Sequence, residues 1–215
     1  MSSLLEAAAP LFAVAFSLFG AEATWLELVA VVLAIAMVVL NIRVNPLAWP
    51  LAIVSSLLYF LLFWRSRLYG EASLQILFAA VACWGWWQWL RGTDAAGKPL
   101  AVRALDARGR LIAIIVMALA WPAIARFLAR ATDSDVPWWD AFPTAGSIVG
   151  QWLLGRKYVE NWPAWIVVNV VAAALFAYKG LWLTTALYAV FVVLSVAGWR
   201  AWQRLAERQS AHGVT

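Results

Sequence analysis

The chain has 215 residues, of which 65% are hydrophobic and only 13% are charged, and its mean hydropathy is +0.81. Soluble domains are about 45–50% apolar and about 25% charged, so this composition excludes an ordinary soluble protein and indicates a lipid environment. The net charge of +5 does not indicate nucleic-acid binding, because the basic residues are spread over short segments between apolar runs.

The first apolar run covers about residues 4–20. It begins with Glu6 and has no basic residue before it, which argues against a secretory signal peptide. We therefore expect an extra N-terminal helix within residues 1–22, either spanning the membrane or lying at its surface.

Seven further apolar runs approach the length of about 20 residues that a spanning helix needs. They cover about residues 23–42, 47–64, 71–91, 111–130, 141–156, 162–178 and 181–202. We expect an all-α integral membrane protein with seven core transmembrane helices, arranged as three helices, one central helix and three more.

A short aromatic motif, G-W-x-x-W, ends the third and the seventh run, at Gly85–Trp89 and at Gly198–Trp202. The copies are 113 residues apart, and a second echo, Asn45–Trp49 against Asn161–Trp165, is offset by 116. This order indicates an internal duplication. Because one central helix separates the repeats, both start on the same side of the membrane, which predicts parallel repeats as in SWEET carriers.

The expected organisation follows from these repeats. It comprises an N-terminal helix (1–22), a first three-helix repeat (23–92), a cytoplasmic loop with the central linker helix (93–136), a second three-helix repeat (137–204) and a cytoplasmic tail (205–215). Repeats of this kind commonly build one site near the membrane midplane, which makes transport the first functional hypothesis.

The distribution of basic residues orients the chain, because cytoplasmic loops are enriched in Lys and Arg. Eleven fall on one side of the seven predicted spans and five on the other. The richer side contains Arg43, Arg91, Lys98, Arg103, Arg108, Arg110, Arg156, Lys157, Arg200, Arg204 and Arg208, and the poorer side contains Arg65, Arg67, Arg126, Arg130 and Lys179. We expect a multi-pass inner-membrane protein with a cytoplasmic C-terminus.

Polar side chains inside the predicted spans are the candidate binding residues, because lipid penalises them unless they face a cavity or a partner. Asn169, near the centre of the sixth span, either binds a planar polar ligand or forms an interhelical hydrogen bond. Gln88 either reads a ligand amide or bonds lipid headgroups. The proposed contacts are Trp49, Gln75, Gln88, Gln151, Asn169, Trp182 and Tyr188, with Trp49 and Trp182 stacking on a ring and the others hydrogen bonding.

The sequence lacks the residues that several kinds of catalytic, metal-binding and ion-coupling sites require. The single cysteine, Cys83, and the single histidine, His212, allow neither a disulfide nor a Cys/His metal site. No phosphate-binding G-x-x-x-x-G-K-[ST] motif occurs, and no span carries a deep pair of charged residues of the kind that couples transport to protons. The sequence therefore favours a non-enzymatic protein without cofactors that moves a neutral or weakly charged solute passively.

Several long motifs resemble those of PnuC-type vitamin transporters. They are Gly150–Pro163, Tyr178–Thr184, Trp49–Tyr59 and Trp84–Trp89, and together they cover about residues 41–202. The resemblance implies a fold similar to a full-length SWEET carrier and facilitated diffusion of nicotinamide riboside, with a cytoplasmic kinase trapping the vitamin. Members of the family for thiamine and riboflavin are the alternatives.

A rival of another class is a structural membrane protein whose 16 tryptophans serve only as interfacial anchors. It predicts no saturable ligand binding. The oligomeric state is left open by the sequence, and a homo-oligomer is compatible with it.

Overall fold

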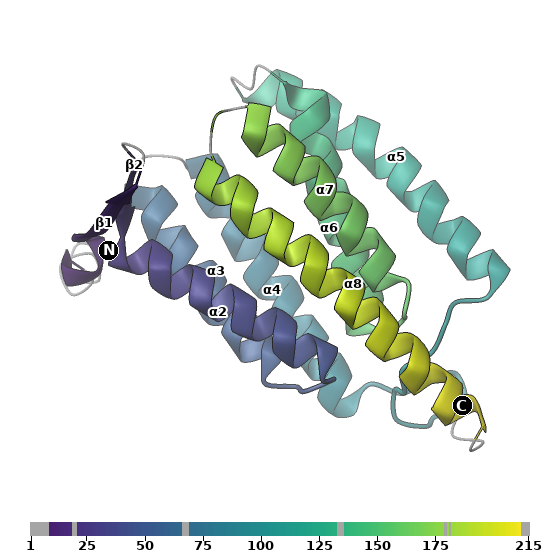
Figure 1. Ribbon diagram of the computed structural model, residues 1–215. Helices are drawn as coiled ribbons and strands as arrows, with labels where there is room; N and C mark the ends of the chain where they lie inside the picture. Colours follow the sequence, from purple (N-terminus) through teal and green to yellow (C-terminus); the bar gives the residue numbers. More distant parts are fainter. Residues whose placement is uncertain are drawn as a thin grey trace. The chain divides into compact units, whose positions relative to one another are not determined.

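The structure is a computed structural model that describes residues 9–18, 21–65, 69–132, 136–178, 180 and 182–211. Each of the seven predicted core segments is an α-helix in these residues, so the all-helical core is confirmed (Figure 1). The elements are η1 (Ala9–Phe12), β1 (Val14–Leu18), β2 (Ala21–Thr24), α2 (Trp25–Ile42), α3 (Ala48–Arg65), α4 (Tyr69–Arg91), α5 (Ala107–Ala131), α6 (Pro137–Gly155), α7 (Asn161–Tyr178) and α8 (Trp182–Ala211).

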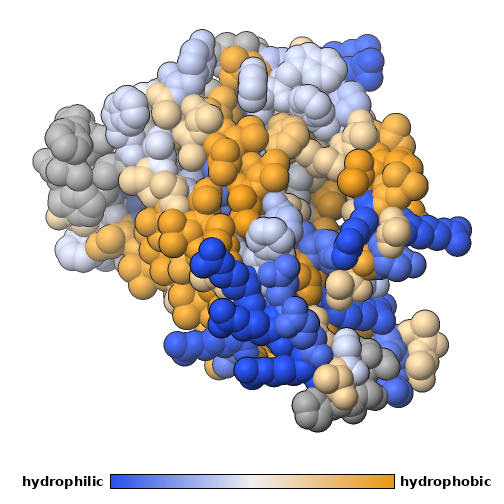
Figure 2. Space-filling model, turned by 45° about the vertical axis from the view of Figure 1, so that its right-hand side comes forward, coloured by the Kyte–Doolittle hydropathy of each residue, from blue (hydrophilic) through white to orange (hydrophobic). Residues whose placement is uncertain are grey.

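The helices present apolar side chains outwards, as expected where lipid is the solvent. Among the described residues, α2, α5, α7 and α8 are each long and apolar enough to cross a membrane. On α5 the exposed residues include Leu111, Ile114, Leu119 and Phe127. Figure 2 shows a broad apolar surface with hydrophilic residues gathered towards one end of it. This outward apolar surface identifies an integral membrane protein rather than a soluble helical bundle.

The expected N-terminal helix is wrong for the described residues that precede α2. Residues 9–12 form a single 3₁₀ turn, and β1 and β2 form an antiparallel hairpin. The physical reason is visible in the sequence: Pro10 would interrupt a helix, and Val14, Phe16 and Leu18 alternate with small residues at the period of a strand. Residues 1–8, 19 and 20 lie outside the described residues.

The chain forms two compact units, Met1–Trp84 and Gly85–Thr215, and the boundary lies inside α4. In the first unit α2 packs against α3, and the Ser55 hydroxyl donates a hydrogen bond to the carbonyl of Ala30 at 3.4 Å. In the second unit α5 packs on α6, α6 on α7 and α7 on α8 (Figure 1).

A capping box fixes the start of α2. The Thr24 hydroxyl accepts from the backbone N–H of Glu27 at 3.2 Å, and the Glu27 carboxylate accepts from the backbone N–H of Thr24 at 2.7 Å. This reciprocal pair satisfies two otherwise unpaired donors at the end of the helix. Glu27 is therefore a capping residue.

The turn after α2 and the turn after α6 have the same backbone hydrogen bonds at positions 113 residues apart. In the first turn, six backbone hydrogen bonds form, each written here as donor N–H to acceptor carbonyl: Arg43 to Val39, Val44 to Asn41, Asn45 to Leu40, Ala48 to Asn45, Trp49 to Pro46 and Leu51 to Leu47. In the second turn the corresponding bonds are Arg156 to Trp152, Lys157 to Leu154, Tyr158 to Leu153, Asn161 to Tyr158, Trp162 to Val159 and Ala164 to Glu160. The two turns are therefore structural equivalents.

This match corrects one detail of the expected repeat. The sequence echo paired Trp49 with Trp165 at an offset of 116, whereas the hydrogen bonds pair Trp49 with Trp162 at the same offset of 113 as the G-W-x-x-W motifs. The offset of 113 therefore relates both the turns and the G-W-x-x-W motifs. The pairing predicted from the sequence was wrong because Trp162 and Trp165 both lie at the start of the same helix, so the sequence alone offers two partners for Trp49.

Both equivalent turns use a left-handed residue that is not glycine. Val44 has a φ of 54° and Lys157 a φ of 58°. The hydrogen bonds from Val44 to Asn41 and from Asn45 to Leu40 form a Schellman motif, in which glycine is the usual residue at this position. Valine is β-branched, so its backbone is strained there.

Replacing Val44 by glycine should raise the free energy of unfolding by about 1 kcal/mol, because the left-handed conformation costs an L-residue roughly 1–2 kcal/mol and glycine avoids that clash. Thermal unfolding of the purified protein in detergent would measure the change. Arg43→Gly is the matched control, since Arg43 has a φ of −82° and gains nothing from glycine. A Val44→Gly protein no more stable than the parent would contradict the strain.

Candidate functional site

The predicted binding residues lie in both units. Trp49, at the start of α3, is 2% exposed, and Gln75, on α4, is half-buried; both belong to the first unit. The other five belong to the second unit, where each has its own surroundings: Gln88, Gln151, Asn169, Trp182 and Tyr188.

Asn169 is buried between α7 and α8. It is 6% exposed, and its side-chain amide donates a hydrogen bond to the hydroxyl of Ser195, which is 2% exposed, at 3.4 Å. The interhelical bond that the sequence allowed is thus present. At 3.4 Å it is longer than a typical hydrogen bond, so the amide is only weakly held.

Gln151 has a free acceptor inside the protein. It lies on α6, and its side-chain carbonyl oxygen Oε1 is buried without a hydrogen-bond partner among the described residues. A buried polar atom that is left unpaired costs about 1–3 kcal/mol. Such an atom in a helix of a membrane protein is a natural contact for the N–H or O–H group of a ligand.

Aromatic rings line the same pair of helices as Asn169. The Tyr188 ring on α8 lies 5.0 Å from Phe176 of α7 and 5.7 Å from Phe191, measured between ring centroids. Trp182, at the start of α8, is 65% exposed, as an interfacial anchor would be. The α7–α8 pair therefore combines a buried amide with a group of rings.

Gln88 lies at the end of the second unit that carries the α4–α5 loop and the α6–α7 turn, which we call the loop end. Its side-chain oxygen accepts a hydrogen bond from the Arg156 guanidinium at 3.0 Å. Gln88 is 9% exposed, and this partly buried hydrogen bond joins α4 to the residue that follows α6. The described partner of Gln88 is thus a protein side chain rather than a headgroup.

Three tryptophans next to Gln88 form what we call the tryptophan cluster, namely Trp89, Trp162 and Trp202. The Trp202 ring lies 6.1 Å from Trp89 and 5.6 Å from Trp162, the second pair edge to face at 84°. The Trp89 indole N–H donates to the carbonyl of Leu154 at 3.0 Å. All three are nearly fully buried. The sequence predicted none of these contacts, although the duplicated G-W-x-x-W motif pointed to two of the members.

A glycine makes room for the cluster. A Cβ atom placed on Gly198 would lie 2.5 Å from the ring of Trp162, a distance that real contacts essentially never show. The glycine of the second G-W-x-x-W motif is therefore required by close packing between α8 and α7.

The α4–α5 loop (92–106) is tied to the α6–α7 turn. The backbone N–H of Arg103 donates to the carbonyl of Lys157 at 3.2 Å, and the N–H of Val159 donates to the carbonyl of Arg103 at 3.0 Å. The Lys157 ammonium donates to the carbonyl of Leu100 at 2.9 Å and lies 5.2 Å from the centre of the Trp89 ring. Burial lowers the pKa of the Lys157 ammonium group. The loop and the lysine together lie against the tryptophan cluster.

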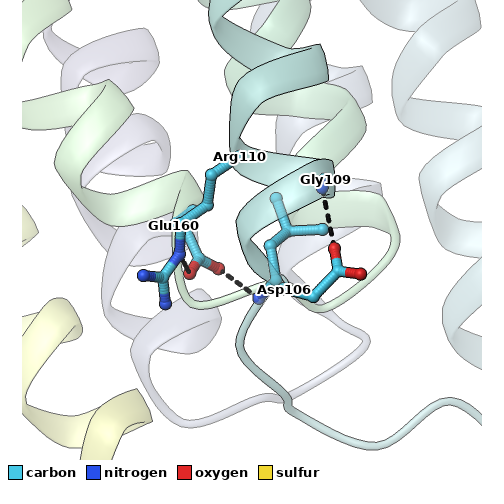
Figure 3. A network of polar contacts seen from close by, with 5 residues as sticks. Asp106, Gly109, Arg110 and Glu160 are labelled. Carbon is cyan, nitrogen blue, oxygen red and sulfur yellow. Dashed lines mark hydrogen bonds and ion pairs between the residues drawn. The ribbon is translucent and has the colours of Figure 1, made fainter.

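An ion pair completes this connection, as Figure 3 shows. The Glu160 carboxylate pairs with the Arg110 guanidinium at 3.0 Å and accepts from the backbone N–H of Leu105 at 2.9 Å. Asp106 caps α5 by accepting from the N–H of Gly109 at 2.7 Å. These contacts hold the start of α5 against the start of α7.

Two clefts lie in the second unit, and neither is lined by a predicted binding residue. One, of about 430 Å³, is lined by Trp121, Trp138, Trp139, Phe142 and Val171. The other, of about 440 Å³, lies at the loop end between α7 and α8 and includes Glu160, Trp199 and Glu207. Among the described residues, no group of three His, Cys, Asp or Glu side chains could hold a metal ion.

Nearly the whole chain matches the profile of one known protein family. The profile of the nicotinamide mononucleotide transporter family matches residues 24–204. The chain is 33% identical to the riboflavin/roseoflavin transporter RibM of Streptomyces davaonensis, covering 91% of this chain and 92% of that protein. It is 24% identical to the nicotinamide riboside transporter PnuC of Escherichia coli, with the same coverage.

A solved structure agrees with these relatives. The crystal structure of the vitamin B3 transporter PnuC matches with a TM-score of 0.70 and 27% identity, covering 86% of this chain and 83% of that chain. The similarity therefore extends over nearly the whole chain in sequence and in fold.

Replacing Gly198 by alanine should lower the free energy of unfolding by about 1–3 kcal/mol, the usual cost of overpacking, because the added methyl group overlaps the Trp162 ring. Thermal unfolding followed by tryptophan fluorescence would measure it. Ala197→Ser is the control, since Ala197 is exposed on the neighbouring position of α8. Equal stability of Gly198→Ala and the parent would show that the close approach is not real.

Proposed function

The chain belongs to the nicotinamide mononucleotide transporter family, and from this premise we propose that it carries nicotinamide riboside across the bacterial inner membrane by facilitated diffusion. The coarser conclusion, a multi-pass membrane transporter of a small vitamin, follows from the family and from relatives that cover nearly the whole chain. Membership of a transporter family also argues against an enzyme.

Riboflavin is the second candidate substrate, because the relative with 33% identity is named as a riboflavin/roseoflavin transporter. Nicotinamide riboside is supported by the named PnuC relatives and by the abundance of aromatic faces. A cationic pyridinium gains about 1–2 kcal/mol from such faces when it is desolvated. Riboflavin is neutral and gains less from charge, although its larger ring buries more area. Thiamine, with a cationic thiazolium, is a third candidate.

We propose a topology of three, one and three spanning helices, in which α5 is the central helix between the repeats α2–α4 and α6–α8. The equivalent turns after α2 and α6 support this assignment, because they occupy the same place in each repeat. With this topology the side with more basic residues is cytoplasmic, and so is the C-terminus. Two of the basic residues counted for this orientation, Arg67 and Lys179, lie outside the described residues.

The observation that best supports a substrate contact is the unpaired, buried side-chain oxygen of Gln151. A carboxamide or ribose group would supply the missing donor. Asn169 offers a second amide, whose N–H group donates a long hydrogen bond to Ser195, and Tyr188 offers a ring and a hydroxyl. Trp49, Gln75, Gln88 and Trp182 stay proposed contacts on the sequence argument.

Passive transport follows from the absence of a deep pair of charged residues in the sequence of the spans. A carrier of this kind equilibrates its substrate and accumulates nothing alone. We therefore propose that a cytoplasmic kinase traps the vitamin by phosphorylation. The proposed function is compatible with a homo-oligomer.

Calorimetric titration of the purified protein with nicotinamide riboside, riboflavin and thiamine in parallel tests the substrate. We expect saturable binding of nicotinamide riboside alone, because a cationic ring gains most from aromatic faces. Exclusive binding of riboflavin would transfer the assignment to the second candidate. Binding of none would favour a purely structural membrane protein.

Gln151→Leu should weaken binding of the transported vitamin about 2- to 10-fold, since the loss of one hydrogen bond between uncharged groups corresponds to about 0.5–1.5 kcal/mol. The leucine also removes an unpaired polar atom, so the fold should be at least as stable as in the parent. Calorimetry and thermal unfolding on the same sample separate the two effects.

Asn169→Leu should likewise lower uptake while leaving the amount of folded protein unchanged. Unchanged affinity in both variants would remove α6 and α7 from the proposed site. Ser147→Ala, one turn before Gln151, is the control for a change on the same helix.

A further inference from the structure

The two G-W-x-x-W motifs place one tryptophan of each copy in direct contact with its own equivalent. The offset of 113 that relates the turns after α2 and α6 also maps Trp89 onto Trp202. In the structure the centroids of these two rings are 6.1 Å apart. Equivalent residues of a duplicated fold therefore meet at this point.

A residue that contacts its own equivalent must lie beside the axis that relates the two copies, as in any two-fold symmetric interface. In the proposed topology of two parallel repeats, the contact between Trp89 and Trp202 is therefore the point at the loop end that lies beside the axis of the repeats. In carriers built from parallel repeats this axis runs along the membrane normal, and the substrate site lies at the repeat interface. In that proposed topology a pathway along the axis passes between these two rings.

The local structure closes the axis at this point. Trp89 is 7% exposed and Trp202 is fully buried, and Trp162 packs edge to face on Trp202. The hydrogen bond to Leu154 fixes the Trp89 indole, and the Lys157 ammonium lies over the same ring. The first tryptophans of the two motifs, Trp86 and Trp199, are each 37% exposed, so burial distinguishes one tryptophan pair from the other within the same motif.

We propose that Trp89 and Trp202 form the gate at the cytoplasmic end of the transport pathway, and that their rings separate when substrate is released. This inference rests on the proposed carrier function and on its topology. It explains why the motif occurs twice, because a gate on a two-fold axis takes one ring from each repeat. Trp162, Gly198 and Lys157 are then positioning residues that hold the closed gate.

The test is a reversible cross-link between the two positions. In a Cys83→Ala background, Trp89→Cys and Trp202→Cys are introduced together, oxidised to a disulfide in proteoliposomes and reduced again. Uptake of radiolabelled nicotinamide riboside, and of riboflavin in parallel, is measured before oxidation, after oxidation and after reduction. We expect oxidation to lower uptake about 10-fold or more and reduction to restore it, because a locked gate traps one of two states.

The matched control uses the exposed pair of the same motif, with Trp86→Cys and Trp199→Cys in the same background. Oxidation should leave uptake in this variant unchanged. A disulfide between positions 89 and 202 that is verified by mass spectrometry and leaves uptake unchanged would overturn the gate.

A second readout covers the case in which the double-cysteine protein does not fold. Ser195→Cys, buried on α8, is labelled with a charged thiol reagent from the C-terminal side, with and without Trp89→Phe, which keeps a ring but removes the bond to Leu154. We expect labelling to be about 10-fold faster in the Trp89→Phe variant, because a weakened closed gate increases the population of the open state, in which the thiol is accessible. An unchanged labelling rate would contradict the gate. If the parent protein carries neither vitamin, the proposed substrate is wrong, whereas this labelling result still decides the gate.

Discussion

Lipid offers no hydrogen bonds, and this constraint decides where every polar group of the protein lies. The backbone of the spans is satisfied within helices, and large apolar side chains cover their outer surfaces. Hydrogen bonds between elements then gather at the loop end of the second unit, where α4, the α4–α5 loop and the α6–α7 turn meet. Polar contacts between neighbouring helices include those of Asn169 with Ser195 and of Ser55 with Ala30.

The loop end is consequently the most constrained part of the second unit. Lys157 illustrates the arrangement, because its backbone adopts a left-handed conformation while its side chain reaches Leu100 and covers Trp89. Its equivalent in the first repeat, Val44, keeps the same backbone without such contacts being available to its short apolar side chain. The two turns thus have the same backbone hydrogen bonds and the same left-handed residue but different side chains at that position.

The proposed binding residues are less completely hydrogen bonded than the loop end. Gln151 has an unpaired acceptor and Asn169 a long hydrogen bond, so both amides are imperfectly satisfied in the protein alone. In the proposed site such amides can pair with the substrate, because no strong internal hydrogen bond has to be broken first. Tight packing at the loop end and incomplete polar pairing in the spans fit a carrier whose rigid parts surround an adaptable site.

The sequence by itself determined the seven helical segments, since long apolar runs in lipid have hardly any alternative to a helix. It also determined the family, through motifs such as Gly150–Pro163, and the burial of Asn169. It failed at residues 9–24, where Pro10 and a period-2 pattern outweigh overall hydrophobicity. Only the tertiary structure decided that Trp162 is the counterpart of Trp49, that Gln88 pairs with Arg156, and that Trp89 meets Trp202. These contacts join residues more than 60 positions apart, or depend on the hydrogen bonds of a turn, and helical periodicity carries no information about either.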